Sequence, residues 1–120
     1  MRNVVDGKAV VHGRPLLEWV PEVVADLVAG FDPLSILLVG SLARGDDGPD
    51  SDIDLVVVMP RVAPELRHEL MSAMQLAVRV PVAVDIFPTD PDEFSQRKDV
   101  VGSFLYWPSR DGRVVYERAA

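Results

Sequence analysis

Apolar residues recur at intervals of three and four along two stretches of the chain. This spacing predicts an amphipathic helix over 15–30 and a second helix over 64–78. Pro15 is expected in the first turn of the first helix and Gly30 just past its end, because helices favour these residue types at those positions. Pro21 falls inside the first stretch, so it is expected to kink or restart the helix.

Short apolar runs bounded by proline or glycine predict buried strands, which cover 34–39, 53–59 and 81–87. Between the first two runs lies a polar segment, 45–51, that is dense in turn-forming residues and predicts a loop. A last short strand is expected over 113–117, directly after the turn formed by Asp111 and Gly112.

Two helical segments are expected between the third and the last strand. The segment 90–98 predicts a helix with Asp90 as its N-cap and Pro91 at its first position. The aromatic-rich segment 100–107 also looks helical. The order is therefore helix, strand, loop, strand, helix, strand, helices and strand. It predicts an α/β or α+β fold, in which a small mixed sheet is flanked by helices.

The chain has 120 residues, which is the size of one domain, so a single domain over 1–120 is expected. Near the N-terminus, the Asp6-Gly7 pair lies between two pairs of β-branched residues and predicts a hairpin over 4–11. The first fourteen residues, 1–14, are therefore expected to form an N-terminal hairpin or arm.

Charge and composition exclude several classes of function. The 19 acidic and 12 basic side chains give a formal net charge of -7, which disfavours direct binding to nucleic acid or to an anionic membrane and suits the binding of divalent cations. The absence of cysteine excludes disulfides, thiolate zinc sites and cysteine nucleophiles. No apolar run approaches the ~20 residues that span a bilayer, and the N-terminus lacks the apolar region of a secretory signal, so a cytoplasmic protein is expected.

Gly40 and Ser41 follow the first predicted strand and precede a short helical turn. Glycine allows a close approach of the backbone to a ligand, and free backbone N–H groups at the start of a helix attract phosphate. By itself this pair is a weak signal, because Gly-Ser after a strand is also an ordinary turn.

Asp52 and Asp54 flank Ile53 at the start of the second predicted strand. Residues two apart in a strand share a face, ~6.6 Å apart along the chain. Their carboxylates repel each other unless a cation lies between them, and a hard divalent cation such as Mg²⁺ prefers such oxygen ligands. A solvated acidic loop is the alternative. Because an apolar run directly follows Asp54, burial begins there, and a charge at that point needs a reason.

Asp85 interrupts the apolar run of the third predicted strand. It is expected to be a third metal ligand or a general base beside the first two carboxylates. A carboxylate at the exposed end of the strand, capping a turn, is the alternative, and it is favoured when Asp85 is considered alone.

Taken together, Gly40-Ser41, ten intervening residues, Asp52-x-Asp54 and the later strand aspartate Asp85 resemble the nucleotidyltransferase superfamily of the DNA polymerase β type. The short length and this spacing are similar to those of the minimal nucleotidyltransferase (MNT) domains, and the similarity extends over 16–117. The resemblance implies a polymerase β-like nucleotidyltransferase fold.

The resemblance also implies a mechanism. The aspartates would hold one or two Mg²⁺ ions that bind the triphosphate of ATP, and Asp85 would help to deprotonate an acceptor hydroxyl. AMP would then pass to that hydroxyl and pyrophosphate would leave. Arg44 could contact phosphate or pair with the acidic loop. The implied site residues are Asp52, Asp54 and Asp85 as catalytic residues and metal ligands, and Gly40, Ser41 and Arg44 as nucleotide contacts.

MNT domains are often the antitoxin of a pair with a HEPN-domain ribonuclease toxin. The resemblance therefore implies a protein partner whose tyrosine is adenylylated, with ATP as substrate and Mg²⁺ as cofactor. Two alternatives remain: a binding module that neutralises a partner by occlusion without chemistry, and a transferase acting on a small molecule of the aminoglycoside kind. Both a homo-oligomer and a hetero-oligomer are compatible with the sequence.

Overall fold

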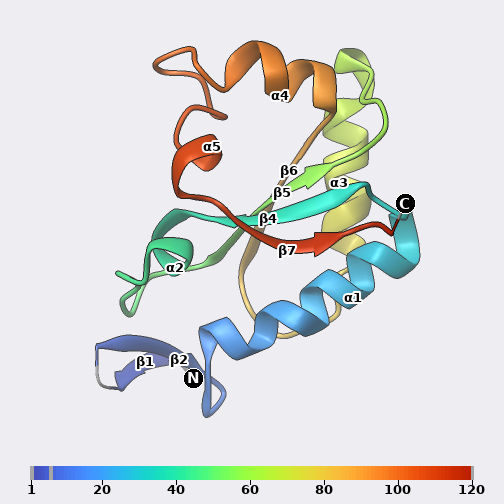
Figure 1. Cartoon of the computed structure of the whole chain (residues 1–120). Helices are drawn as coiled ribbons and strands as arrows, with labels where there is room; N and C mark the ends of the chain where they lie inside the picture. Colours follow the sequence, from blue (N-terminus) through green and yellow to red (C-terminus); the bar gives the residue numbers. More distant parts are fainter. Residues whose placement is uncertain (1, 6, 120) are drawn as a thin grey trace.

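The computed structural model of the chain describes residues 2–5 and 7–119, so Met1, Asp6 and Ala120 lie outside the described residues. The strands are β1 (Arg2–Val5), β2 (Lys8–Val11), β3 (Arg14–Pro15), β4 (Ser35–Val39), β5 (Ile53–Val58), β6 (Val84–Thr89) and β7 (Arg113–Glu117). The helices are α1 (Val20–Phe31), α2 (Gly40–Arg44), α3 (Arg67–Ala77), α4 (Pro91–Arg97) and α5 (Pro108–Asp111), with 3₁₀ turns at Leu16–Trp19 and Pro64–Leu66. Figure 1 follows them along the chain.

The main sheet has the strand order β6-β5-β4-β7. The β5–β6 pair is parallel, and β4 pairs antiparallel with both β5 and β7, so the sheet is mixed as predicted. In the β5–β6 register Asp54 lies directly beside Asp85, and across the antiparallel pair Val39 lies beside Asp54. The topology therefore brings three segments that are distant in the sequence to one end of the sheet.

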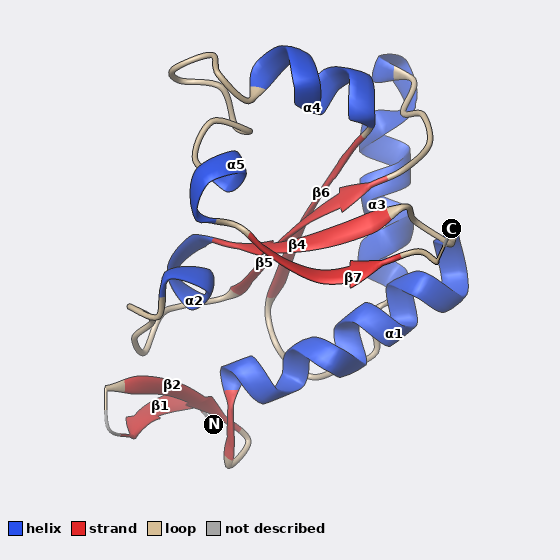
Figure 2. Ribbon diagram, viewed as in Figure 1, coloured by secondary structure: helices blue, strands red, loops and turns tan. Residues whose placement is uncertain are grey.

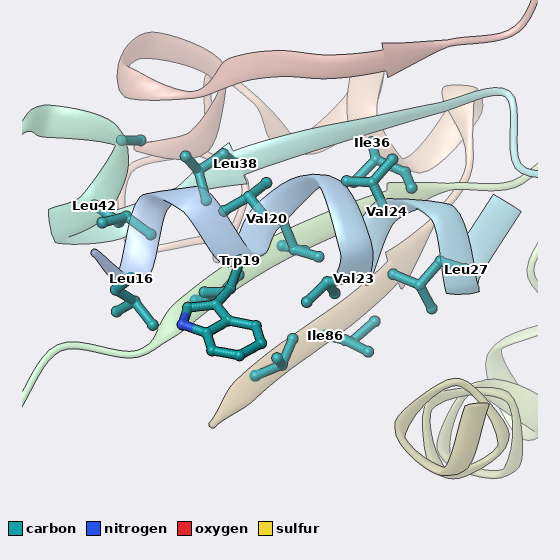
Figure 3. Packing of buried hydrophobic residues seen from close by; sticks show 14 of the residues in the cluster. Leu16, Trp19, Val20, Val23, Val24, Leu27, Ile36, Leu38, Leu42 and Ile86 are labelled. Atoms are coloured by element: carbon teal, nitrogen blue, oxygen red, sulfur yellow. The ribbon is translucent and has the colours of Figure 1, made fainter. Parts of the chain in front are cut away.

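Helices cover both faces of this sheet (Figure 2). The larger core lies under α1 and α3, where apolar residues of α1 pack against β4 and β6 (Figure 3). A smaller core on the opposite face joins Val56 and Val58 of β5 to Leu105, with Phe94 of α4 packed against it. Burial of each large side chain contributes roughly 1.5–3 kcal/mol, so these two layers hold the sheet rigidly. The predicted flanked sheet is confirmed.

The first helix restarts at Pro21, as predicted. The 3₁₀ turn Leu16–Trp19 ends just before this proline. The helix α1 then begins at Val20, with Pro21 in its first turn. The predicted end at Gly30 is wrong, because the helix continues to Phe31. Asp32 ends it in the left-handed conformation, at φ 48°, and its N–H donates to the Val28 carbonyl over 3.0 Å.

The third strand of the main sheet begins later than the sequence predicts, at Val84 instead of Pro81. Its pairing starts where β5 starts, opposite Ile53, so the preceding residues have no strand to pair with. The strand also continues through Pro88, beyond the predicted end. Proline is tolerated there because β6 lies at the edge of the sheet and needs backbone hydrogen bonds on one side only.

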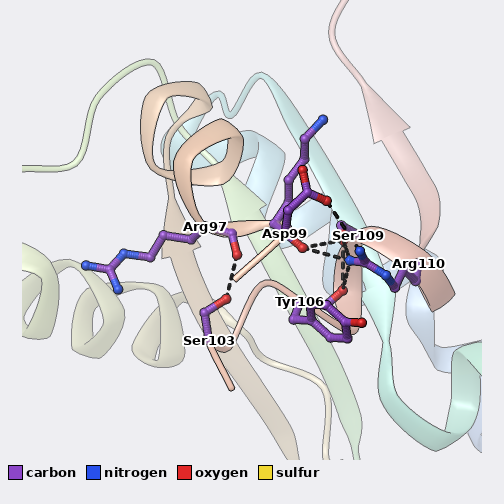
Figure 4. Close-up of polar contacts among 7 residues, drawn as sticks. Arg97, Asp99, Ser103, Tyr106, Ser109 and Arg110 are labelled. Carbon is purple, nitrogen blue, oxygen red and sulfur yellow. Dashed lines mark hydrogen bonds and ion pairs between the residues drawn. The ribbon is translucent and has the colours of Figure 1, made fainter. Parts of the chain in front are cut away.

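The predicted helix over 100–107 is wrong. Gly102 adopts φ 90°, which a right-handed helix does not allow, and the segment forms a series of turns. Backbone hydrogen bonds between residues three apart close these turns, as from the Ser103 N–H to the Val100 carbonyl over 3.0 Å, and side chains add to them. Arg110 Nη1 donates to the carbonyl oxygens of Lys98 (2.7 Å) and Tyr106 (3.0 Å), as Figure 4 shows.

A small three-stranded sheet precedes α1. The strands β1 and β2 pair antiparallel, as the sequence predicts for 4–11, and β3 adds a short third strand to β2. Figure 1 shows this N-terminal sheet below the loop that follows α2. None of the helices in the described part of the chain has the length and apolar character of a bilayer-crossing segment.

Candidate active site

The ends of three elements surround a polar hollow of about 520 Å³. The element α2 follows β4 on one side, and β5 and β6 begin on the other. All six site residues expected from the sequence line this hollow. The residues of the polar hollow are Gly40, Ser41, Arg44, Gly48, Pro49, Asp50, Ser51, Asp52, Asp54 and Asp85.

Asp54 and Asp85 lie side by side in the polar hollow. They are neighbours across the parallel β5–β6 pair, and their carboxyl groups are hydrogen-bonded. Partial burial is the largest cause that raises the pKa of Asp54 to about 6, followed by the charge of Asp85, this hydrogen bond and the charge of Asp52. Arg44 opposes the shift and lowers the pKa of Asp54. Asp54 therefore holds a proton at a pH where an ordinary aspartate is ionised.

This pair fits a hard divalent cation. Two carboxylates in contact repel each other, and a cation between them would remove both that repulsion and the need for a shared proton. Oxygen ligands of this kind suit Mg²⁺. The described residues contain no group of three or more histidine, aspartate and glutamate side chains arranged to hold a metal. Asp52 lines the same hollow and raises the pKa of Asp54, but its role as a third ligand stays a prediction.

Gly40 makes room for Asp54. The glycine has φ 74°, and a Cβ built on it would lie 2.5 Å from Asp54 Oδ2. A side chain at this position would therefore be strained and would displace the carboxylate. The close approach expected of Gly40 is made in this structure by Asp54, and an ordinary Gly-Ser turn does not account for it.

Ser41 is joined to the loop that closes the polar hollow. Its Oγ lies 2.9 Å from Ser51 Oγ, and Ser51 Oγ also accepts a hydrogen bond from the Gly48 N–H over 2.9 Å. The segment 48–51 is thereby folded back onto the start of α2. This arrangement sets the width of the hollow where a phosphate chain would lie.

Two contacts are expected of Arg44 from the sequence, one with phosphate and one with the acidic loop, and the structure contains the second. The Arg44 Nε donates to Asp46 Oδ2 over 3.3 Å, so it pairs with the acidic loop. The side chain is 44% exposed and also lines the polar hollow. A surface pair of this kind is weak, so the guanidinium is free to turn towards an anionic ligand at little energetic cost.

Asp47 is a structural residue of the site that the sequence analysis missed. It is 7% exposed and accepts a hydrogen bond from the Ala9 N–H over 2.9 Å. Lys8 Nζ lies 3.8 Å from Asp47 Oδ1 and donates to the Gly45 carbonyl. The N-terminal sheet therefore anchors the loop of the polar hollow. Nothing in the local sequence separates this aspartate from the exposed Asp46 beside it.

A second hollow, largely apolar and about 420 Å³ in volume, adjoins the first. It shares Asp54 and Asp85 with the polar hollow and extends away from α2. We call it the apolar hollow. Its residues are Val39, Asp54, Leu55, Val56, Met71, Ser72, Gln75, Asp85, Ile86, Phe87, Phe104 and Pro108. No pattern in the sequence predicts this hollow, because its walls come from five separate segments of the chain.

Comparison with known proteins agrees with this geometry. The nucleotidyltransferase domain family matches residues 17–106, which include every residue of the polar hollow. The fold is similar to the crystal structure of an inferred nucleotidyltransferase from Sulfolobus solfataricus, with a TM-score of 0.62 and 23% identity over 86% of this chain and 81% of that one. No curated protein matches the sequence significantly. The matched range spans most of the sequence, and the chain belongs to the nucleotidyltransferase domain family, with a polymerase β-like fold.

Proposed function

We propose that this protein transfers a nucleoside monophosphate from a nucleoside triphosphate, AMP from ATP, to a hydroxyl group. The observation that carries the proposal is the contact between the Asp54 and Asp85 carboxyl groups, at the mouth of a hollow lined by Gly40, Ser41 and Arg44. Two acidic groups are held together there at a cost to the fold, as the raised pKa of Asp54 records. Such a cost is typical of a functional site.

One or two Mg²⁺ ions would be held by Asp54 and Asp85, with Asp52 as the third predicted ligand. Bound there, Mg²⁺ would supply positive charge to the triphosphate and to the leaving pyrophosphate. The residues of the chain have roles of their own. Gly40 leaves space for the Asp54 carboxylate, and Arg44 offers a cation at the rim of the polar hollow.

The transfer is an in-line displacement at the α-phosphorus. The acceptor oxygen forms a bond to this phosphorus while the bond to the bridging oxygen breaks, and pyrophosphate leaves with the electron pair of that bond. The hydroxyl proton passes to a carboxylate, and Asp85 is the candidate because it is exposed where the two hollows meet.

For the acceptor we propose a tyrosine of a partner protein, a HEPN-type ribonuclease toxin that is silenced by the modification. The described residues support a protein acceptor, since they form two small sheets whose helices build the core and the polar hollow, and an acceptor that brings its own surface suits this arrangement. The protein would then act as a cytoplasmic antitoxin, in the compartment that supplies ATP and Mg²⁺.

A binding module that acts by occlusion is the second candidate. A specific observation favours it: a third hollow, about 660 Å³ in volume and lined mainly by apolar side chains of α1, lies between α1 and β7, on the far side of the molecule from α4. Leu17, which is 47% exposed, lines this hollow together with Val115 and Tyr116 of β7. In this reading the carboxylates would be dispensable for neutralising a partner.

Calorimetric titration with ATP tests the proposal. We expect ATP to bind in the presence of Mg²⁺, to be released by EDTA, and to bind no longer to Asp54→Asn. The matched control is Asp92→Asn, which removes the same charge from the exposed first turn of α4 and should bind as the wild type does. Equal binding by Asp54→Asn and the wild type, or no binding of any nucleotide, would contradict the proposal and favour occlusion.

A further inference from the structure

The apolar hollow has a direct connection to the proposed chemistry. It meets the polar hollow at Asp54 and Asp85, the two residues that line both. On the polar side lie Ser41 and Arg44, where the triphosphate is expected. The apolar hollow opens from the same two carboxylates towards β6 and α3. An α-phosphorus at the carboxylates would therefore face both spaces.

The geometry of the displacement assigns a reactant to each space. In an in-line reaction the attacking oxygen approaches opposite the leaving oxygen. Pyrophosphate leaves on the side of Ser41 and Arg44, so the acceptor hydroxyl comes from the side of the apolar hollow. This step rests on the proposed function, which places the triphosphate in the polar hollow.

The walls of the apolar hollow suit an acceptor with an aromatic body. The rings of Phe87 and Phe104 are in contact, with centroids 3.6 Å apart and planes tilted by 37°, and Met71 adds a polarisable side chain. The polar wall residues are few, and one of them, Gln75, already donates its Nε2 hydrogen to the Val84 carbonyl over 2.9 Å. A polyhydroxylated or multiply charged acceptor would lose its hydration there without replacement.

The segment that carries Phe104 is held in place by its own hydrogen bonds. Ser103 Oγ donates to the Arg97 carbonyl over 2.6 Å, and Arg110 Nη1 donates to the carbonyl oxygens of Lys98 and Tyr106 (Figure 4). The wall is therefore formed before any ligand binds. A preformed wall lowers the entropic cost of seating a rigid ring.

We propose that the apolar hollow receives the acceptor and selects a phenolic hydroxyl, with the ring between Met71 and Phe104 and the hydroxyl directed at Asp85. The oxygen of the phenol attacks the α-phosphorus and its proton passes to the Asp85 carboxylate. Selection follows from the walls, because an aliphatic hydroxyl without a ring leaves the hollow unfilled.

Methyl NMR of Met71 tests where the phenol binds. The probes are N-acetyl-tyrosinamide and N-acetyl-serinamide, which present a hydroxyl with and without the ring, in the presence of Mg²⁺ and α,β-methylene-ATP. We expect the tyrosine probe to shift the Met71 methyl with a millimolar Kd and the serine probe to leave it unchanged. The fully buried Met74 is the internal control. No shift with the tyrosine probe, or equal shifts with both, would overturn the inference.

A variant pair separates the acceptor from the nucleotide. Phe104→Ala is expected to raise the Kd of the tyrosine probe by about tenfold, because one face of the ring site is lost, and to leave the affinity for Mg²⁺ and α,β-methylene-ATP unchanged. Trp107→Ala, in the same segment but outside the hollow, should change neither. If Phe104→Ala weakens nucleotide binding, the base occupies the hollow and the inference is wrong.

Failure of the proposed function has a different signature. In that case α,β-methylene-ATP with Mg²⁺ would leave the amide signals of Gly40 and Ser41 unchanged, and the inference would fall with it. Nucleotide-induced shifts at these two amides, without a response of Met71 to the tyrosine probe, would overturn the assignment of the acceptor alone.

Discussion

The backbone N–H of Ala9 donates a hydrogen bond to Asp47 Oδ2 over 2.9 Å, and this contact joins the N-terminal sheet to the loop of the polar hollow. The carboxylate is 7% exposed. Ala9 lies outside the range matched by the nucleotidyltransferase family, 17–106, whereas Asp47 lies inside it. A segment outside the matched family domain therefore anchors the loop of the polar hollow.

Asp47→Ala should lower the free energy of unfolding by about 1–3 kcal/mol, because the buried N–H of Ala9 loses its acceptor. The Ala9 amide should also exchange its hydrogen faster. Chemical denaturation and hydrogen exchange measure the two effects. The matched control is Asp46→Ala, which removes only an exposed pair with Arg44 and should change stability by less than about 0.5 kcal/mol. Equal effects of the two variants would show that the Ala9 contact does not anchor the loop.

Gly40→Ala should destabilise the protein more than its backbone conformation alone explains. A left-handed alanine costs about 1–2 kcal/mol, and at this position the new methyl group would also displace Asp54. Gly13→Ala is the control for the first effect, since Gly13 has φ 77° and no atom near its Cβ position. Thermal unfolding of both variants gives the difference.

Removal of the carboxylate should relieve part of this strain. In an Asp54→Ala background, Gly40→Ala is expected to cost no more than Gly13→Ala does, because the contact with Asp54 Oδ2 is gone. Full additivity of the two substitutions would contradict the steric role of Gly40. The comparison needs only unfolding measurements and no knowledge of the acceptor.

Local patterns predicted the elements of this fold well where local interactions decide them. Helical spacing identified α1 and α3, the apolar runs identified β4 and β5, and Asp90-Pro91 identified the start of α4. The wrong predictions concern segments whose conformation depends on contacts with another part of the chain. The start of β6 depends on β5, and the turns over 100–107 depend on Gly102 and on hydrogen bonds from Arg110.

The candidate site also has a part that could be predicted from the sequence and a part that could not. The resemblance to the nucleotidyltransferases predicted that Gly40, Ser41, Asp52, Asp54 and Asp85 share one site. In the fold they line one hollow, because the pairing of β5 with β6 sets Asp54 beside Asp85. Neither the anchoring role of Asp47 nor the apolar hollow could be predicted, since both depend on segments that meet only in the folded chain.

Asp90 should stabilise α4 through two backbone donors. Its Oδ1 accepts the Glu93 N–H and its Oδ2 accepts the Val62 N–H, each over 2.9 Å. These bonds are the main causes that lower the pKa of Asp90 below its usual value of 3.8. Asp90→Ala should reduce the free energy of unfolding by about 1 kcal/mol near neutral pH, and Asp90→Asn by less, because the amide oxygen still accepts one bond.

The contribution of Asp90 depends on pH in a defined direction. Its carboxylate stabilises the fold above the pKa of the unfolded chain, and this contribution is lost as the pH falls through the lower pKa of the folded state. The difference between the wild type and Asp90→Ala should therefore shrink in acid. A difference that stays constant down to the most acidic conditions would show that the cap acts without its charge.

Asp54→Asn should stabilise the protein near neutral pH, against the usual effect of a substitution at a site. The folded state raises the pKa of Asp54 from 3.8 to about 6 through burial and through the charge of Asp85, so the folded protein binds a proton more tightly than the unfolded chain. The wild type therefore loses stability as the pH rises from about 4 to about 6, and the full penalty is present above that range. Water screens this partly exposed group, so we expect a gain of about 1 kcal/mol for the variant.

Denaturation of both proteins at about pH 4 and about pH 8 measures the gain, which should be absent at the lower pH because the wild-type carboxyl is then protonated. Mg²⁺ provides the link to function. At the higher pH it should raise the stability of the wild type by mass action and leave Asp54→Asn unchanged, because the variant lacks one of the two adjacent carboxylates that a cation would bridge. A gain in stability that persists at the lower pH, or equal stabilisation of both proteins by Mg²⁺, would show that repulsion between Asp54 and Asp85 is not what a bound cation relieves.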